Sequence, residues 1–127
     1  MNLNQITIPS KDVATSVEFY KKLGLKLIVD SSPRYVRFEC PNGESTFSIH
    51  EVTKLPTNEG EGIWIYFECE NLDEHVKNLQ NQGIFFDETP NDKVWEWREA
   101  RLKDPDNHTL ILFYAGDNRK NPAWRVK

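Results

Sequence analysis

The chain has 127 residues, of which 38% are hydrophobic and 28% are charged, and its formal net charge is −4. This balance predicts a single soluble globular domain, and it argues against a disordered chain or one whose main partner is nucleic acid. No apolar run approaches the roughly 18–20 residues of a membrane helix, and the N-terminus lacks the features of a signal peptide. Cys40 and Cys69 are too few for a disulfide framework and are interpreted as free thiols in a reducing cytoplasm.

The first half of the chain predicts strands around one short helix. Apolar and polar residues alternate in three segments, which are residues 5–8, 35–40 and 46–50. Such alternation is typical of strands with one apolar and one polar face. A helix is predicted over residues 12–23, because Asp12 can cap its start, apolar residues recur at helical spacing, and Gly24 follows its end.

The second half repeats this pattern. Alternation recurs over residues 63–69 and 97–102, whereas residues 110–114 are apolar on both faces and predict a strand covered on both sides. A second helix is predicted over residues 71–82. Asn71 and Glu74 resemble a capping box at its start, and Gly83 marks its end.

The two halves are related by an internal repeat. Residues 5–27 align without a gap on residues 64–86, 59 positions further along. The matching apolar pairs are Ile6 with Ile65, Ile8 with Phe67, Val13 with Leu72, Val17 with Val76, Tyr20 with Leu79 and Leu25 with Ile84, and Gly24 falls on Gly83. A repeat that occurs only twice does not predict a stacked array. It predicts one α+β domain over residues 1–127, built from two βαβββ modules at about residues 3–55 and 63–116. Residues 56–62 are the expected linker, residues 117–127 form a tail, and the two sheets are expected to surround a shared cleft.

Strand parity predicts which residues line this cleft. One face of each sheet is expected to meet its helix, and the opposite face carries large aromatics beside polar groups, which is typical of a ligand site. The residues assigned to that face are Gln5, Arg37, Ser48, His50, Trp64, Tyr66, Glu68, Trp97, Glu99, Arg101 and Ile111. The alternative is that some of the aromatic residues merely fill the cleft or lie between subunits.

Two segments resemble the vicinal oxygen chelate superfamily, which includes glyoxalase I, fosfomycin-resistance proteins, bleomycin-resistance proteins and extradiol dioxygenases. They are LNQITIPSKDVATSVEFYKKLGLKL near the start and ARLKDPDNHTLILF near the end. The resemblance covers roughly residues 3–116. It implies that the two βαβββ modules form an incomplete barrel around a cleft, commonly within a homodimer.

The resemblance also implies where a metal would bind. Metal-dependent members place ligands on the first and last strands of each module. Gln5 occupies the first such position, and either Ser48 or His50 occupies the next. Trp64 and Ile111 occupy the other two, and neither side chain has a lone pair to give a metal.

An alternative site is suggested by residues of the same face. If one divalent metal ion is bound, its expected ligands are Gln5, His50 and Glu99, with positions left open for a substrate. The competing interpretation is structural: Glu99 pairs with His50, Arg37 or Arg101, because a charged group in a cavity needs a partner whether or not a metal is present.

These expectations define the predicted function. The leading hypothesis is a cytoplasmic glyoxalase/bleomycin-resistance-like protein that holds a small polar or aromatic molecule. If it is an enzyme, it is a lyase or dioxygenase-type member other than glyoxalase I, acting on a substrate with neighbouring oxygens through His50 or Glu99. The predicted substrate-binding residues are Arg37, Ser48, Trp64, Tyr66, Glu68, Trp97, Arg101 and Ile111.

Two other functions are compatible with the sequence. One is a metal-free protein that binds or sequesters a small molecule without catalysis, and the other is an interaction module whose cleft is filled by its own aromatics. A homodimer is expected because the sheets leave open edges that a second copy can cover. Neither a nucleic acid nor a membrane is expected as a partner.

Overall fold

The computed structural model describes residues 1–57 and 62–126. Positions 58–61 of the predicted linker and Lys127 of the predicted tail lie outside the described residues. The chain divides into two compact units. The described part of the first unit comprises residues 1–57 and 104–107, and that of the second comprises residues 62–103 and 108–126.

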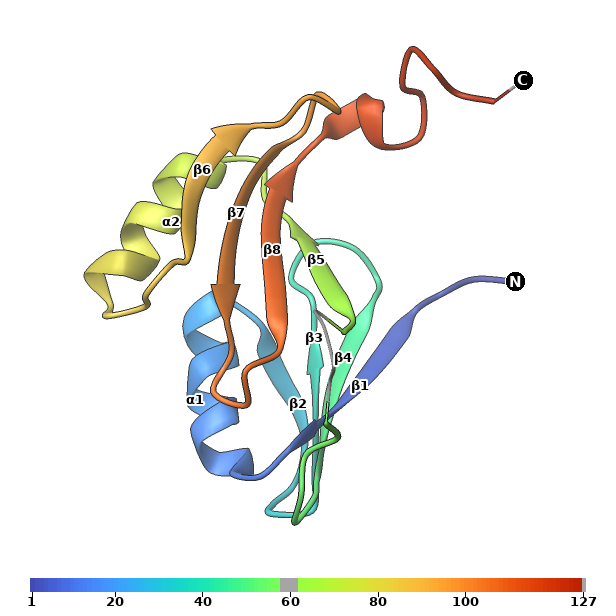
Figure 1. Ribbon diagram of the computed structural model, residues 1–127. Helices are drawn as coiled ribbons and strands as arrows, with labels where there is room; N and C mark the ends of the chain where they lie inside the picture. The colour runs from blue at the N-terminus through green and yellow to red at the C-terminus, as the bar shows by residue number, and fades with distance from the viewer. Residues whose placement is uncertain (58–61, 127) are drawn as a thin grey trace. The chain divides into compact units, whose positions relative to one another are not determined.

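The first unit contains one sheet and one helix (Figure 1). Its strands, in spatial order, are β1 (Gln5–Ser10), β4 (Thr46–Glu51), β3 (Tyr35–Glu39) and β2 (Lys26–Ser31). β1 and β4 run parallel, whereas the other neighbours are antiparallel. This is the predicted β-α-β-β-β order.

Helix α1 (Val13–Leu23) begins and ends where the sequence predicts. The Asp12 side chain accepts a hydrogen bond from the Thr15 backbone N–H, and Gly24 adopts a left-handed conformation with φ of 108°. The helix is attached to the sheet by its apolar side. The Tyr20 ring lies 4.7 Å from that of Phe47 and 6.1 Å from that of Phe38, measured between ring centroids.

The second unit repeats this arrangement. Its strands are β5 (Trp64–Glu68), β8 (Thr109–Tyr114), β7 (Arg98–Lys103) and β6 (Glu88–Asp92), again with one parallel pair at β5 and β8. Helix α2 (Leu72–Asn81) packs against β6, β7 and β8. A short 3-10 helix, η1 (Gly116–Arg119), follows β8.

The start of α2 differs from the sequence prediction. Asn71 is the N-cap residue, but its side chain makes no capping hydrogen bond. The helix is instead held by burial of Leu72, Val76 and Leu79, the three apolar positions that the sequence assigns to its inner side. Packing of an apolar stripe therefore replaces the expected capping box.

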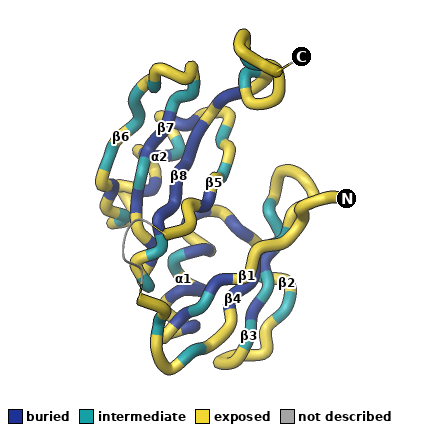
Figure 2. The backbone as a smooth tube through the Cα atoms, turned by 45° about the vertical axis from the view of Figure 1, so that its right-hand side comes forward, coloured by how far each residue is buried: buried dark blue, intermediate teal, exposed yellow. Residues whose placement is uncertain are grey.

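Strand parity is as predicted in both sheets. β8 is buried at every position except Tyr114, in agreement with its two apolar faces (Figure 2). In the first sheet, Phe47 and Phe38 lie opposite each other and meet α1, so their neighbours Ser48 and Arg37 lie on the other face. In the second sheet, Arg98 donates to Asp73 of α2 at 2.8 Å and thereby marks the helix-covered face.

The β7–β8 turn belongs to the first unit and explains the Asp-Pro-Asp-Asn sequence. The buried Tyr20 hydroxyl donates to Asp104 Oδ2 at 2.5 Å, and the Ser16 hydroxyl donates to Asp106 Oδ2 at 3.0 Å. The Lys11 backbone N–H donates to Asp106 Oδ1 at 2.9 Å. Both carboxylates of the turn therefore anchor it to α1 and the residue that precedes the helix.

Both cysteines are unpaired and half-buried. Burial, together with the nearby Glu68 carboxylate, raises the pKa of the Cys69 thiol to about 11. Burial also raises the pKa of Cys40. At neutral pH the two thiols are protonated and poorly nucleophilic, so neither is suited to redox or nucleophilic chemistry.

Among residues 1–57 and 62–126, no helix is long and apolar enough to span a bilayer.

Replacing Tyr20 by Phe is expected to lower the free energy of unfolding by about 1.5–3 kcal/mol at neutral pH, because Asp104 loses a buried donor. Burial, followed by the Asp104 charge, raises the pKa of Tyr20 well above its usual value. Above about pH 10 the unfolded chain ionises this tyrosine while the folded chain does not, so the wild-type advantage should shrink as pH rises.

Urea unfolding of wild type and Tyr20→Phe across pH 7–11 measures both effects. Tyr114→Phe is the matched control, since Tyr114 is 45% exposed. Equal stability of wild type and Tyr20→Phe at pH 7 would show that the Tyr20–Asp104 bond does not stabilise the fold.

Candidate functional site

Each sheet has a helix-free face, which is the face opposite its own helix. Strand register places all residues of the predicted cleft lining except Trp97 on one of these two faces, and Trp97 lies on the second face by its packing against Phe113. Gln5, Arg37, Ser48 and His50 share the helix-free face of the first sheet. The helix-free face of the second sheet carries the remaining predicted residues, which are Trp64, Tyr66, Glu68, Trp97, Glu99, Arg101 and Ile111.

The polar residues of the first helix-free face bind one another. Ser48 is completely buried, and its hydroxyl lies 2.5 Å from that of Thr7. Arg37 Nε donates to the Tyr35 hydroxyl at 2.9 Å. Desolvation raises the pKa of Tyr35, but hydrogen bonds from Ser48 and Arg37 outweigh it and leave the pKa below its usual value. His50, beside Tyr35 in the register, is exposed.

The second helix-free face is organised around a buried carboxylate. Glu99 of β7 is 0% exposed, although ionised carboxylates are rarely taken out of water without full compensation. Its Oε2 accepts a hydrogen bond from the Trp95 indole N–H at 2.6 Å. Its Oε1 is buried and has no hydrogen-bond partner in the described part of the chain.

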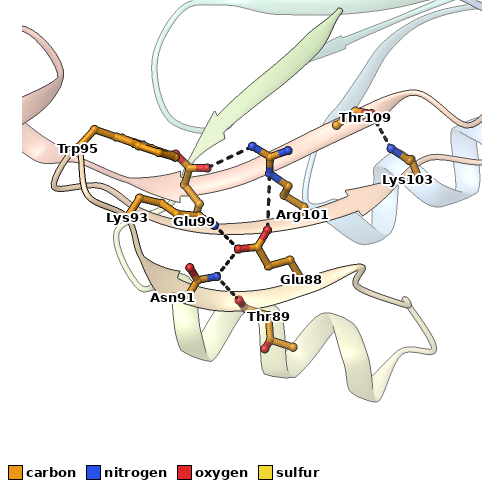
Figure 3. Close-up of polar contacts among 9 residues, drawn as sticks. All are labelled: Glu88, Thr89, Asn91, Lys93, Trp95, Glu99, Arg101, Lys103 and Thr109. Atoms are coloured by element: carbon orange, nitrogen blue, oxygen red, sulfur yellow. Dashed lines mark hydrogen bonds and ion pairs between the residues drawn. The ribbon is translucent and has the colours of Figure 1, made fainter. Parts of the chain in front are cut away.

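Arg101 lies two residues further along β7 and on the same face. Its Nη2 is 4.0 Å from Glu99 Oε1, which is too long for a hydrogen bond, and its Nε is 3.7 Å from Glu88 Oε2. Figure 3 shows the guanidinium between these two carboxylates. Arg101 Nε is itself buried and makes no hydrogen bond with the described residues.

The outer end of this arrangement is fixed by β6 and the turn after it. Glu88 pairs with Lys93 and accepts from Asn91 Nδ2 at 2.6 Å. Hydrogen bonds from Lys93 and then Asn91 hold the pKa of Glu88 below its usual value, so it is ionised at neutral pH. We refer to Glu88, Lys93, Glu99 and Arg101 together as the Glu99 cluster.

Aromatic rings cover the same face. Trp97 stacks on Phe113 with ring centroids 4.8 Å apart, and the Tyr66 ring lies nearly perpendicular to both rings. Trp97 also packs against the buried residues Ile111 and Ala115, so it belongs to the floor of the site. Burial, with the Glu99 charge second, raises the pKa of Tyr66 and keeps its hydroxyl protonated.

Two other indoles are half-open to solvent. Trp64 is 37% exposed, and the Arg101 Cζ atom lies 4.6 Å from its ring centre, in a cation–π contact. Trp95 is 39% exposed and holds Glu99 by its N–H. These two rings are therefore available to a ligand, whereas the predicted contact Ile111 is completely buried.

Glu68 has a role that the sequence did not indicate. Its Oε2 accepts from the backbone N–H groups of Ala115 and Gly116, both at 2.9 Å, and its Oε1 is 3.9 Å from Arg119 Nε. The carboxylate thus ties β5 to the residues that follow β8. It can contact a ligand only while holding these partners.

The metal ligands predicted from the sequence fall in both units of the chain. No group of three or more His, Cys, Asp or Glu side chains is arranged to hold an ion among residues 1–57 and 62–126. The helix-free face of the second sheet presents Trp64 and Ile111 where metal-binding relatives are expected to carry donor atoms. The proposed ligands Gln5 and His50 lie in the first unit and Glu99 in the second, so this set remains a prediction.

The sequence prediction missed part of the second site. The residues that strand parity assigns to the cleft do not include Trp95, Glu88, Lys93 or Phe113. Trp95 reaches Glu99 through the β6–β7 hairpin, in which Lys93 N–H donates to the Trp97 carbonyl at 2.8 Å. Glu96 in this turn has a φ of 66°. The signal that could have placed Trp95 in the site is the Trp-Glu-Trp-Arg-Glu run at residues 95–99. In this run Trp95, Trp97 and Glu99 occupy every second position.

Comparison with known proteins identifies the family. A sequence profile of the Glyoxalase/Bleomycin resistance protein/Dioxygenase superfamily matches residues 2–112. The chain belongs to this superfamily, as the opening and closing motifs predicted. No curated relative matches the sequence significantly.

Solved structures support the same fold. A glyoxalase/bleomycin resistance protein/dioxygenase from Nocardioides is 22% identical, with a TM-score of 0.73 over 91% of this chain and 83% of that chain. A superfamily member from Sphaerobacter thermophilus DSM 20745 is 23% identical, with a TM-score of 0.70 over 90% and 97%. A lactoylglutathione lyase from Agrobacterium tumefaciens is 14% identical, with a TM-score of 0.73 over 98% and 97%. At these identities the likeness establishes the fold alone.

Replacing Trp95 by Phe is expected to destabilise the protein by about 1–3 kcal/mol, because it removes the donor on which the buried Glu99 carboxylate depends. The cost should be smaller in a Glu99→Gln background, since a neutral amide is less costly to leave without that donor. A double-mutant cycle from urea unfolding measures this coupling.

Trp124→Phe is the control, because Trp124 is 57% exposed in the tail. If Trp95→Phe costs the same with Glu or Gln at position 99, the indole stabilises the fold by packing and not through the carboxylate.

Proposed function

We propose that this chain binds a small, flat molecule on the helix-free face of its second sheet, and that binding requires no metal ion. Glu99 and Arg101 supply hydrogen bonds, and the exposed rings of Trp64 and Trp95 contact the ligand. This is the small-molecule-binding function predicted from the sequence, now argued from one unit of the structure.

One observation carries the proposal. Glu99 Oε1 and Arg101 Nε are both buried, and neither has a hydrogen-bond partner among the described residues. Leaving a buried polar group unpaired costs about 1–3 kcal/mol, and more when the group is charged. A fold that tolerates two such groups on adjacent same-face positions of one strand is best explained by a ligand that completes their bonds.

The aromatic surroundings support the same conclusion. Ligand sites are mostly apolar and contain a few convergent polar groups that fix orientation. The stacked pair of Trp97 and Phe113 forms a rigid floor, while Trp64 and Trp95 are exposed enough to contact a ring from solvent. Flat molecules gain most from such a surface, because ring–ring contacts add about 0.5–1.5 kcal/mol beyond burial.

An enzymatic function is the second candidate, and the unpartnered Glu99 Oε1 also favours it. A buried carboxylate oxygen with no donor can accept a proton from a bound substrate. In this form of the proposal the substrate carries neighbouring oxygens, and His50 or Glu99 acts as base or as metal ligand. The homodimer and the cytoplasmic location also remain predictions.

Binding is expected to depend on the Glu99 carboxylate. In a Trp124→Phe background, flat bicyclic compounds should quench the fluorescence of the remaining tryptophans. Glu99→Gln should raise the dissociation constant of these compounds about tenfold, because one charged hydrogen bond is lost. Glu74→Gln, on the exposed side of α2, should bind as the parent does. Equal binding by the Glu99→Gln and parent proteins would refute the proposal.

Glyoxalase I activity is expected to be absent. Trp64 and Ile111 leave the second sheet without two of the donors that this chemistry needs, which should weaken metal binding far more than the 10- to 100-fold of an outer-shell change. The assay is isomerisation of the methylglyoxal–glutathione adduct with added nickel or zinc.

If the purified protein nevertheless contains a metal, His50→Ala should remove it, and elemental analysis measures that loss. Robust isomerisation by the wild-type protein would contradict the expectation and show that the ligand positions were misassigned.

A further inference from the structure

The charges of the Glu99 cluster cancel within the second unit. Lys93 pairs with Glu88, Glu88 lies 3.7 Å from Arg101, and Arg101 lies 4.0 Å from Glu99. Two carboxylates and two cations therefore alternate along one connected row (Figure 3). A charged ligand group placed against this row would leave one buried charge without a counter-charge, which is strongly unfavourable.

The two unmet hydrogen bonds are of opposite kind. Glu99 Oε1 can only accept, whereas Arg101 Nε–H can only donate. A ligand that satisfies both must therefore offer one donor and one acceptor on the same side. A hydroxyl group or the N–H and C=O edge of a lactam has this property without carrying a charge.

Access to the Arg101 guanidinium from solvent involves the Trp64 ring. Trp64 lies over the Arg101 guanidinium, is 37% exposed, and belongs to β5, the edge strand of its sheet. An exposed cation–π contact stabilises by only about 0.5–1 kcal/mol. The aromatic ring of a ligand can take the place of Trp64 over Arg101 and so retain a contact of the same type.

From these observations we propose that the ligand of this site is an uncharged aromatic molecule whose polar group both donates and accepts a hydrogen bond. This inference rests on the proposed binding function and adds its specificity. The site selects against anions and cations because the Glu99 cluster is already neutral. It selects against ethers because an ether gives Glu99 Oε1 no donor.

Four naphthalenes that differ only in their polar group test this specificity. 2-Naphthol is neutral at pH 7 and both donates and accepts, 2-methoxynaphthalene only accepts, 2-naphthoate is an anion, and 2-naphthylmethylammonium is a cation. Saturation-transfer NMR titrations give a dissociation constant for each. Wild type is expected to prefer 2-naphthol over each of the others by about tenfold, because one unmet hydrogen bond or unbalanced charge costs at least that much.

Two variants should change the preference in opposite directions. Glu99→Gln removes a negative charge from the cluster, so the affinity for 2-naphthoate should rise about tenfold relative to the affinity for 2-naphthol. Arg101→Gln removes a positive charge, so the affinity for 2-naphthylmethylammonium should rise relative to the affinity for 2-naphthol. Because each comparison is a ratio of two ligands on one variant, a change in the folded fraction cancels. Glu74→Gln should leave all four ratios unchanged.

The outcomes separate the two proposals. If none of the four compounds binds to the wild-type protein, the proposed binding function fails. If they bind but wild type prefers a charged compound, or does not distinguish 2-naphthol from its methyl ether, the specificity inference is overturned while the binding function stands. If the ratios of dissociation constants between ligands are the same in wild type, Glu99→Gln and Arg101→Gln, the inference is also overturned.

Discussion

Coverage of each sheet by a helix on one face only is the constraint on which the other features of this protein depend. Successive strand residues point to opposite faces, so a single helix per sheet can cover only half of them. In the first unit Tyr20, Phe38 and Phe47 meet at the helix-covered face. Polar and aromatic side chains are thereby concentrated on the opposite face of each sheet. The same rule, applied twice along the chain, gives two helix-free faces of different chemistry.

The two faces differ in how completely their polar groups are bonded. On the first, Ser48 and Arg37 find partners in Thr7 and Tyr35, so the polar groups largely satisfy one another. On the second, Glu99 is buried, and no described residue makes a hydrogen bond with its Oε1. Because a buried polar atom without a hydrogen bond is costly to a fold, the second face is the stronger candidate for a ligand site.

Much of the fold could be predicted from the sequence, because alternation and helix stops are local signals. The helices and the faces of the strands follow from these local patterns, and the family follows from the opening and closing motifs together with the internal repeat. The hydrogen bond from Trp95 to Glu99 could not be predicted, since Trp95 reaches the carboxylate through a hairpin whose Glu96 adopts a left-handed conformation. The anchoring of Asp104 by Tyr20 was equally hidden, because 84 positions separate the two residues.

The most direct measurement follows the indole N–H signals of the four tryptophans by NMR while 2-naphthol is added to isotope-labelled protein. Trp95 donates its N–H to Glu99, so a ligand that binds this carboxylate must perturb that signal. We expect the Trp95 and Trp64 signals to shift together and saturably, while the Trp124 signal stays in place. Saturable binding that leaves the Trp95 signal unchanged would contradict a ligand site at Glu99.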